Sequence, residues 1–144
     1  MKKIMIALMC LAVSGFFGEL CARELSWESD LNKARSIAQE QKKKTILLFF
    51  TAPGWCGPCR RLESETIPSA GFAKVAKKAV LVKMDFSDRT KVTPEMNQAA
   101  KDFRLRGYPS LIVLSADGKE KGRIVGYKPA KAYLKTLEKL IEAK

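Results

Sequence analysis

A short apolar segment, followed almost at once by two closely spaced cysteines, constrains the fold more than any other feature. The segment runs from Thr45 to Thr51, and after three further residues comes Trp55-Cys56-Gly57-Pro58-Cys59. An unbroken apolar run of this length is typical of a strand that is covered on both faces, as in parallel sheets. The sequence therefore predicts an α/β fold in which a buried strand leads into a helix that carries two thiols.

The spacing of the two cysteines allows them to close a disulfide and to reopen it. We expect a helix from about Cys56 to Glu65, which would aim free backbone N–H groups at the Cys56 sulfur and favour its thiolate, the attacking form. Pro58 suits the first turn, where its missing N–H has no partner to lose. The sequence thus predicts that Cys56 attacks and that Cys59, one turn further on, resolves.

The Trp-Cys-Gly-Pro-Cys run after a buried strand resembles the active site of the thioredoxin family. Zinc and haem-attachment sites share the bare CxxC spacing, but the chain has no histidine and Arg60 follows Cys59, which excludes histidine-ligated metals, the covalent haem motif and Ser-His or Cys-His nucleophiles. The resemblance covers Trp27 to Ile141. It implies a thioredoxin fold, with a central mixed sheet and helices on both faces, and no metal or organic cofactor.

Helices and strands alternate along the rest of the chain in an order that fits this fold. Helices are expected at 30–43 with Ser29 as N-cap, at 69–78 with Ser69 as cap, at 94–103 with Thr93 as cap, and at 130–144; further strands are expected at 79–86, 111–114 and 122–125, with a possible edge strand at 23–27. The last helix carries a leucine-rich stripe that we assign to the core: Leu134, Leu137, Leu140 and Ile141.

A second part of the site is implied by the resemblance. Thioredoxin-like proteins have a cis proline beside the CxxC, and Tyr108-Pro109 directly before a predicted strand matches that motif. The residue before this proline offers its backbone to a bound polypeptide. We therefore expect a substrate-binding surface made of Trp55, Gly57, Pro58, Tyr108 and Pro109. Trp55 either shields the disulfide or forms part of the apolar rim that meets a partner.

One departure from the family pattern concerns proton transfer. The buried aspartate that thioredoxins carry beneath the CxxC is replaced here by Phe49, or by Phe50 if the intervening loop is counted without a gap. Glu63 lies four residues after Cys59 and so on the same side of the helix. A carboxylate at this spacing resembles the C-terminal domain of DsbD, the membrane electron carrier of the bacterial periplasm. Glu63 is therefore a candidate catalytic residue.

Glu63 also admits a plainer interpretation. It can be an exposed helix charge, paired with Arg60 one turn earlier. Lys83 and Asp85, late in the next predicted strand, are weaker candidates for the same proton transfer.

The N-terminus has the pattern of an export signal. Lysines at residues 2–3 precede a mostly apolar run over 4–17, which is typical of a secretory signal peptide and short for a membrane span of about 20 residues. We expect cleavage after Ala22. This divides the chain into a signal peptide at 1–22 and a thioredoxin-like domain at 23–144.

The sequence also allows other kinds of processing or anchoring of the N-terminus. Cleavage after Gly15, an uncleaved membrane anchor and lipid attachment at Cys21 are the alternatives. If cleavage follows Ala22, Cys10 and Cys21 leave with the signal peptide and only the Cys56–Cys59 pair is left. An exported chain with a single CxxC pair is expected to handle disulfides rather than to be held together by one.

The net positive charge of the chain does not identify the class of binding partner. The net charge is +12, which would suit nucleic acid, anionic lipid or acidic proteins. The basic residues are scattered along the chain, and export argues against nucleic acid. We therefore interpret them as a solvated surface.

Together these features predict a periplasmic thiol:disulfide oxidoreductase that acts as a monomer. We expect it to reduce protein disulfides and to receive electrons from a membrane donor of the DsbD type. A protein disulfide isomerase, suggested by Tyr108 before Pro109, and a reductase of cytochrome c maturation are alternatives. A redox-inert binding module or chaperone is an alternative of another class.

Overall fold

The computed structural model describes residues 25–43 and 45–143. The predicted signal peptide, its cleavage site and the thiols of Cys10 and Cys21 lie outside these residues, as does Lys44.

A mixed sheet of five strands forms the centre of the described chain. Its spatial order is β1-β3-β2-β4-β5. The strands are β1 (Trp27–Glu28), β2 (Thr45–Thr51), β3 (Ala79–Asp85), β4 (Ser110–Ser115) and β5 (Glu120–Val125). β1 and β2 both pair with β3 in parallel, whereas β4 runs antiparallel to β2 and to β5. Every residue of the central strand β2 is buried, as its unbroken apolar sequence predicts.

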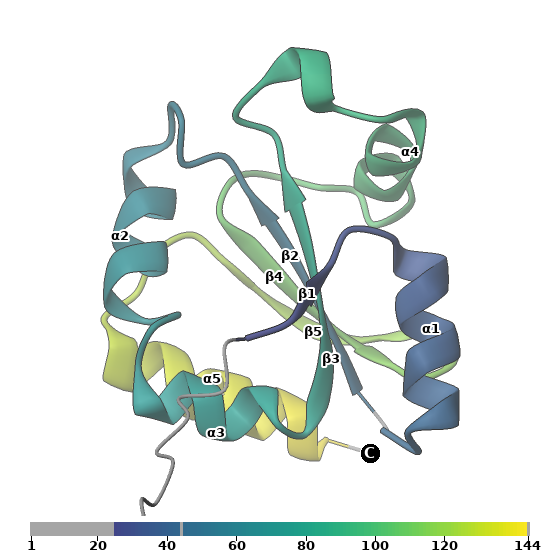
Figure 1. Ribbon diagram of the computed structural model, residues 1–144. Helices are drawn as coiled ribbons and strands as arrows, with labels where there is room; N and C mark the ends of the chain where they lie inside the picture. Colours follow the sequence, from purple (N-terminus) through teal and green to yellow (C-terminus); the bar gives the residue numbers. More distant parts are fainter. Residues whose placement is uncertain (1–24, 44, 144) are drawn as a thin grey trace, which may run out of the picture.

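Helices cover both faces of the sheet (Figure 1). One face carries α2 (Gly57–Glu65), α3 (Ala70–Ala76) and α5 (Ala130–Glu142), and the other carries α1 (Leu31–Glu40) and α4 (Pro94–Asp102). A short 3₁₀ turn, η1 (Arg89–Lys91), follows β3. The arrangement confirms the predicted thioredoxin fold.

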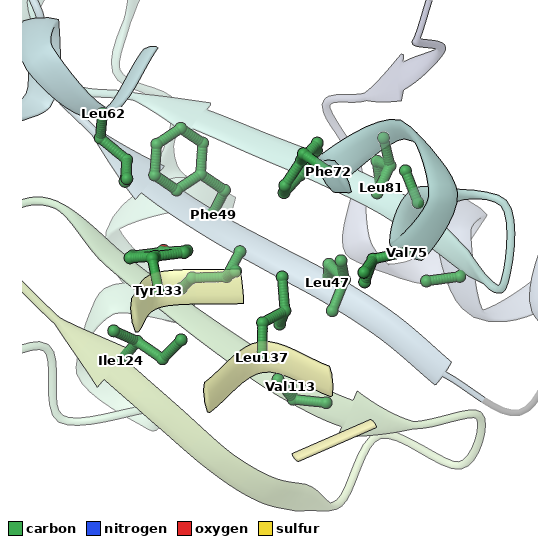
Figure 2. Close-up of a cluster of buried hydrophobic side chains, with 13 residues drawn as sticks. Leu47, Phe49, Leu62, Phe72, Val75, Leu81, Val113, Ile124, Tyr133 and Leu137 are labelled. Atoms are coloured by element: carbon green, nitrogen blue, oxygen red, sulfur yellow. The ribbon is translucent and has the colours of Figure 1, made fainter. Parts of the chain in front are cut away.

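Alternate residues of β2 point into two separate cores. Figure 2 shows the core on the α2 side, where Phe49 packs with Leu62, Phe72, Tyr133 and Leu137. Phe50 lies in the opposite core, under α1 and α4. Phe49 is therefore the residue beneath the cysteine-bearing helix.

The α5 stripe belongs to the core on the α2 side, as predicted. Leu137 is fully buried, whereas the other members of the stripe pack against the margin of the core: Leu134, Leu140 and Ile141. Tyr133 on the same helix is also buried, and this burial raises the pKa of its hydroxyl.

The two ends of α1 differ from the sequence prediction. Asp30, not Ser29, is the N-cap, and its carboxylate accepts the N–H groups of Asn32 and Lys33 at 2.7 and 3.3 Å. The helix also ends at Glu40 rather than near residue 43, because Lys42 takes a left-handed conformation (φ 53°) and the following N–H closes the turn, as in a Schellman motif. The lysines at 42 and 43 therefore follow the helix instead of forming its last turn.

Other helix starts agree with the prediction. The hydroxyls of Ser69 and Thr93 cap α3 and α4, accepting the N–H groups of Phe72 and Met96, each at 3.2 Å. α2 begins directly after Cys56. The two thiols are thus placed where the sequence requires them, at the end of a loop that leaves the central strand.

Candidate active site

Cys56 and Cys59 form a disulfide at the start of α2, with their Cα atoms 5.3 Å apart. Cys56 is the N-cap residue, and its sulfur accepts the backbone N–H of Cys59 at 3.2 Å. Cys59 is completely buried, whereas Cys56 retains 7% of its exposure. An incoming group can therefore reach Cys56 and not Cys59, and the helix start favours a thiolate at Cys56 once the pair is reduced.

The loop before Cys56 is anchored to the end of β3. The Gly54 N–H donates to the hydroxyl of Ser87 at 2.8 Å, and the indole N–H of Trp55 donates to the carbonyl of Phe86 at 3.1 Å. The approach is so close that a Cβ at residue 54 would lie 2.8 Å from the Ser87 Cβ. A larger residue at position 54 would therefore collide with the Ser87 side chain, which accounts for glycine here.

Aromatic side chains surround the approach to the disulfide. Trp55 is 58% exposed, and its ring meets the edge of Tyr108 at a centroid distance of 5.3 Å. Phe86 and Tyr108 also pack against the small apolar cluster that contains Cys56 and Cys59. Both interpretations of Trp55 are therefore compatible with its position, since it is bonded to its own fold and still presents an open apolar face.

Tyr108 packs against the cluster that contains the two cysteines, and Pro109 follows it in the chain. The peptide bond between Tyr108 and Pro109 is cis, and the carbonyl of Pro109 accepts the N–H of Gly126 at 2.7 Å. Partial burial raises the pKa of Tyr108. The structure thus brings Tyr108 against Trp55 and Cys56, which belong to a different part of the chain. The roles of these residues toward a substrate remain predictions.

Gly57 and Pro58 form the first turn of α2. A Cβ on Gly57 would meet only the Arg60 guanidinium, at 3.8 Å, so no steric contact in the described chain requires glycine there. Arg60 donates to the carbonyl of Pro53 at 2.8 Å. Its guanidinium is held against the active-site loop and forms no ion pair with Glu63 within the described residues.

Glu63 belongs to a half-buried polar cluster under α2. One carboxylate oxygen accepts the hydroxyl of Thr51 at 2.6 Å, and the other accepts the ammonium of Lys83 at 2.5 Å. The side chains of Glu63 and Lys83 are 21% and 30% exposed. The interpretation of Glu63 as an exposed charge paired with Arg60 is therefore wrong.

The partners of Glu63 come from β2 and β3. Phe49 pairs with Lys83 in the parallel register, so Thr51 and Lys83 lie on the same side of the sheet as Phe49. Sequence reasoning missed Thr51, although the period of two along a strand places it on the Phe49 side. Asp85, the other weak candidate, is exposed, and its carboxylate accepts the N–H of Ser87 at 2.8 Å.

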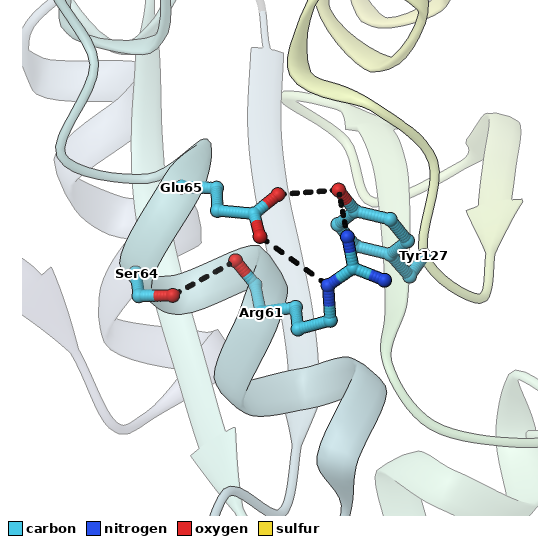
Figure 3. Close-up of polar contacts among 4 residues, drawn as sticks. All are labelled: Arg61, Ser64, Glu65 and Tyr127. Carbon is cyan, nitrogen blue, oxygen red and sulfur yellow. Dashed lines mark hydrogen bonds and ion pairs between the residues drawn. The ribbon is translucent and has the colours of Figure 1, made fainter.

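A second polar cluster joins α2 to the segment after β5 (Figure 3). The Arg61 guanidinium lies 4.2 Å from the centre of the Tyr127 ring and also donates to the Tyr127 hydroxyl at 3.1 Å. That hydroxyl donates to Glu65, which lowers the pKa of Glu65 and raises that of Tyr127. Because Gly126 bonds to Pro109, this cluster connects the two parts of the site. No local pattern in the sequence predicts this cluster.

Residues 25–43 and 45–143 contain neither a metal-binding cluster nor a membrane-spanning helix. No group of three or more Cys, Asp or Glu side chains in these ranges is arranged to hold a metal ion. No helix in them has both the length and the apolar character needed to cross a membrane.

Known proteins are similar to this chain in sequence and in fold. A family model described as a thioredoxin-like domain matches residues 31–141. The disulfide bond reductase DsbH of Chlamydia pneumoniae is 28% identical over 76% of the chain and 68% of its own length. The thiol:disulfide interchange protein DsbD of Campylobacter jejuni is 32% identical over 75% of the chain, which corresponds to only 18% of DsbD. A solved structure of a DsbH oxidoreductase superposes with a TM-score of 0.71 at 25% identity, covering 88% of this chain and 90% of that one. With its Cys56–Cys59 disulfide at the start of α2, the chain therefore belongs to the thioredoxin-like family of thiol:disulfide oxidoreductases.

Proposed function

We propose that this protein is an exported reductase of protein disulfides. The Cys56 thiolate attacks one sulfur of a substrate disulfide, forms a mixed disulfide and releases the first substrate thiolate. Cys59 then loses its proton and attacks the Cys56 sulfur, which releases the second substrate thiolate. Two electrons pass to the substrate and the Cys56–Cys59 disulfide remains. The observation that carries the proposal is the difference in burial, with Cys56 reachable and Cys59 enclosed.

Reduction is favoured over oxidation by two considerations. Gly-Pro between the cysteines resembles reducing thioredoxins, whose potential is about −270 mV, against about −120 mV for the oxidant DsbA. The relatives DsbH and DsbD carry the names disulfide bond reductase and thiol:disulfide interchange protein. We extend the reductase direction from DsbH to this chain.

Export and electron supply complete the proposal. Residues 1–22 act as a signal peptide that leaves a periplasmic, monomeric domain from Arg23 onward. The periplasm is oxidising, so a reductant there needs a steady source of electrons. A membrane electron donor of the DsbD type fills this role.

Trapping thiols in intact cells tests the direction of the reaction. Acid quench followed by alkylation should find the Cys56–Cys59 pair mostly reduced in normal cells and oxidised once the membrane donor is deleted. Mass spectrometry of the same envelope fraction should find an N-terminus near Arg23. A pair oxidised in normal cells, with a potential above about −180 mV, the value for disulfide isomerase, would contradict the reductase assignment.

Three activities in vitro and in cells separate the related functions. Reduction of insulin favours a general reductase, and recovery of scrambled ribonuclease favours an isomerase. Failure of haem attachment in a deletion strain favours a role in cytochrome c maturation. The first two assays use the full domain and the third uses a deletion strain. None of them requires knowledge of the natural substrate.

We also propose that Glu63 takes part in removing the proton of Cys59. It lies one turn after Cys59 on α2, and its bonds to Thr51 and Lys83 fix it at the sheet. Because general acid–base groups contribute about 10²- to 10⁴-fold, Glu63→Gln should slow resolution of a preformed mixed disulfide about 10-fold or more near neutral pH. The first attack by Cys56 should be almost unchanged. Stopped-flow measurement of both steps across pH checks this.

Glu65→Gln is the matched control, since it removes a carboxylate from the same helix at the Arg61 and Tyr127 cluster. Its resolution rate should follow the wild type at every pH. If the resolution rate of Glu63→Gln depended on pH as in the wild type, Glu63 would have only a structural role, as the ion-pair partner of Lys83.

A further inference from the structure

A groove of about 610 Å³ opens beside the disulfide, outside the residues assigned to the exchange reaction. Its lining contains three neighbouring aromatic rings, Trp55, Phe86 and Tyr108. The other lining residues are Ser87, Arg89, Val92 and Asn97. We call this cavity the Arg89 groove. It begins at the residue directly before Cys56 and reaches the residue directly before Pro109, so a polypeptide bound at the disulfide can continue into it.

The aromatic part of the lining is fixed before any ligand binds. The ring of Tyr108 lies 5.3 Å from Trp55 and 5.6 Å from Phe86, measured between centroids. The indole N–H of Trp55 is bonded to the backbone of Phe86. The three rings therefore form a continuous apolar surface that suits an aliphatic or aromatic side chain.

Within the described part of the chain, Arg89 is the one charged side chain that lines this groove. Among residues 25–43 and 45–143 it forms no ion pair. Its neighbour Asp88 is turned to other groups, accepting the N–H and hydroxyl of Thr90 and pairing with Lys91. These contacts, above all the hydrogen bonds from Thr90, lower the pKa of Asp88. They also mean that the Asp88 carboxylate is bonded to Thr90 and Lys91 and not to Arg89. The guanidinium at the groove is thus available to an outside carboxylate.

We propose that the Arg89 groove selects substrate polypeptides in which an apolar residue and an acidic residue stand next to the disulfide-bonded cysteine. The apolar side chain packs on the three rings, and the carboxylate pairs with Arg89. This inference rests on the proposed reductase function and names its substrate preference. Arg89 is then a specificity-determining residue that does not touch the reacting sulfurs.

The composition of the groove favours a polypeptide with a carboxylate over a polyanion. A surface that follows a nucleic acid or a phosphate-rich membrane presents several cations, because affinity grows with each phosphate neutralised. Within the Arg89 groove one guanidinium stands beside three rings, which matches an apolar side chain and a single negative charge; the cations of the adjoining hollow, Lys101, Arg104 and Arg106, lie outside it.

Three disulfide-bonded peptides that differ in one residue test the preference. Each carries leucine beside its cysteine and then Asp, Asn or Lys, and hydroxyethyl disulfide serves as a small substrate that cannot fill the groove. At low salt kcat/KM for the Asp peptide should exceed that for the Asn peptide about 2- to 5-fold, the range of a single exposed ion pair, with the Lys peptide lowest. The difference should reside in KM and shrink as salt is added.

Two variants locate the effect. Arg89→Gln should equalise the Asp and Asn peptides, and Arg89→Glu should make the Lys peptide the best substrate, both with unchanged turnover of hydroxyethyl disulfide. Lys78→Gln removes an exposed cation that lies outside the groove and is not paired with Asp88, and it should keep the wild-type preference.

The outcomes distinguish the two proposals. Equal rates on all peptides, or the same loss in Lys78→Gln as in Arg89→Gln, would overturn the groove assignment while turnover of the small disulfide upholds the reductase. A protein that reduces neither peptides nor hydroxyethyl disulfide overturns the proposed function and this inference with it.

Discussion

Cys59→Ala should convert the protein into a covalent trap for its substrates. Attack by Cys56 still occurs, but no second thiol remains to release the mixed disulfide. Cys56→Ala should trap nothing and should lose disulfide reduction by a factor on the order of 10³ or more, as expected for loss of a nucleophile. Non-reducing electrophoresis of envelope extracts, followed by mass spectrometry of the adducts, measures the first effect, and insulin reduction measures the second.

The double variant, with both cysteines replaced by alanine, is the control for this pair. It should retain the fold, because neither of the two large hydrophobic cores contains a cysteine, and should show no reductase activity or adducts. Equal trapping by both single variants would refute the division of labour between the thiols. Biological function that survives in the double variant would instead support a redox-inert binding module or chaperone.

Phe49→Ala should cause the largest loss of stability among simple truncations near the site. Phe49 is 1% exposed, and its ring centroid lies 5.9 Å from that of Trp27. It also packs with Leu62 of the cysteine-bearing helix. Removing a fully buried phenylalanine costs about 3 to 5 kcal/mol. Urea denaturation of the oxidised protein, with a constant m-value, checks the free energy of unfolding.

Phe103→Ala provides the comparison, since this phenylalanine is only partly buried at the edge of the other core. Its loss should be clearly smaller than that of Phe49→Ala. A loss below about 1 kcal/mol in Phe49→Ala, the range of surface substitutions, would mean that Phe49 does not support α2 as the packing indicates.

Local sequence signals were sufficient for most of the fold. The apolar run of β2 predicted a strand buried on both faces, and the hydroxyls at Ser69 and Thr93 predicted two helix starts. At α1 two capping residues stand side by side, and the sequence rule does not choose between Ser29 and Asp30. The choice depends on where the preceding chain leaves the sheet.

The polar parts of the site could be predicted less well because their partners are distant in sequence. Lys83 meets Glu63 across 20 residues and Arg61 meets Tyr127 across 66. The first contact requires the register of β3 on β2, and the second requires the direction in which the chain leaves β5. Periodicity in a single segment contains neither. Glu63 was found by its spacing from Cys59, whereas its bonding partners depended on tertiary structure.

The bridge from α2 through Tyr127 to Gly126 and Pro109 has a consequence for how partners are received. Arg61 of α2 contacts Tyr127, and the neighbouring Gly126 is hydrogen-bonded to Pro109. The distance between α2 and the segment that carries Pro109 is therefore determined when the chain folds. A substrate polypeptide thus binds to a surface that is ordered before binding. The conformational entropy of that segment is lost during folding rather than during each encounter, and this preorganisation leaves more of the interaction energy for affinity.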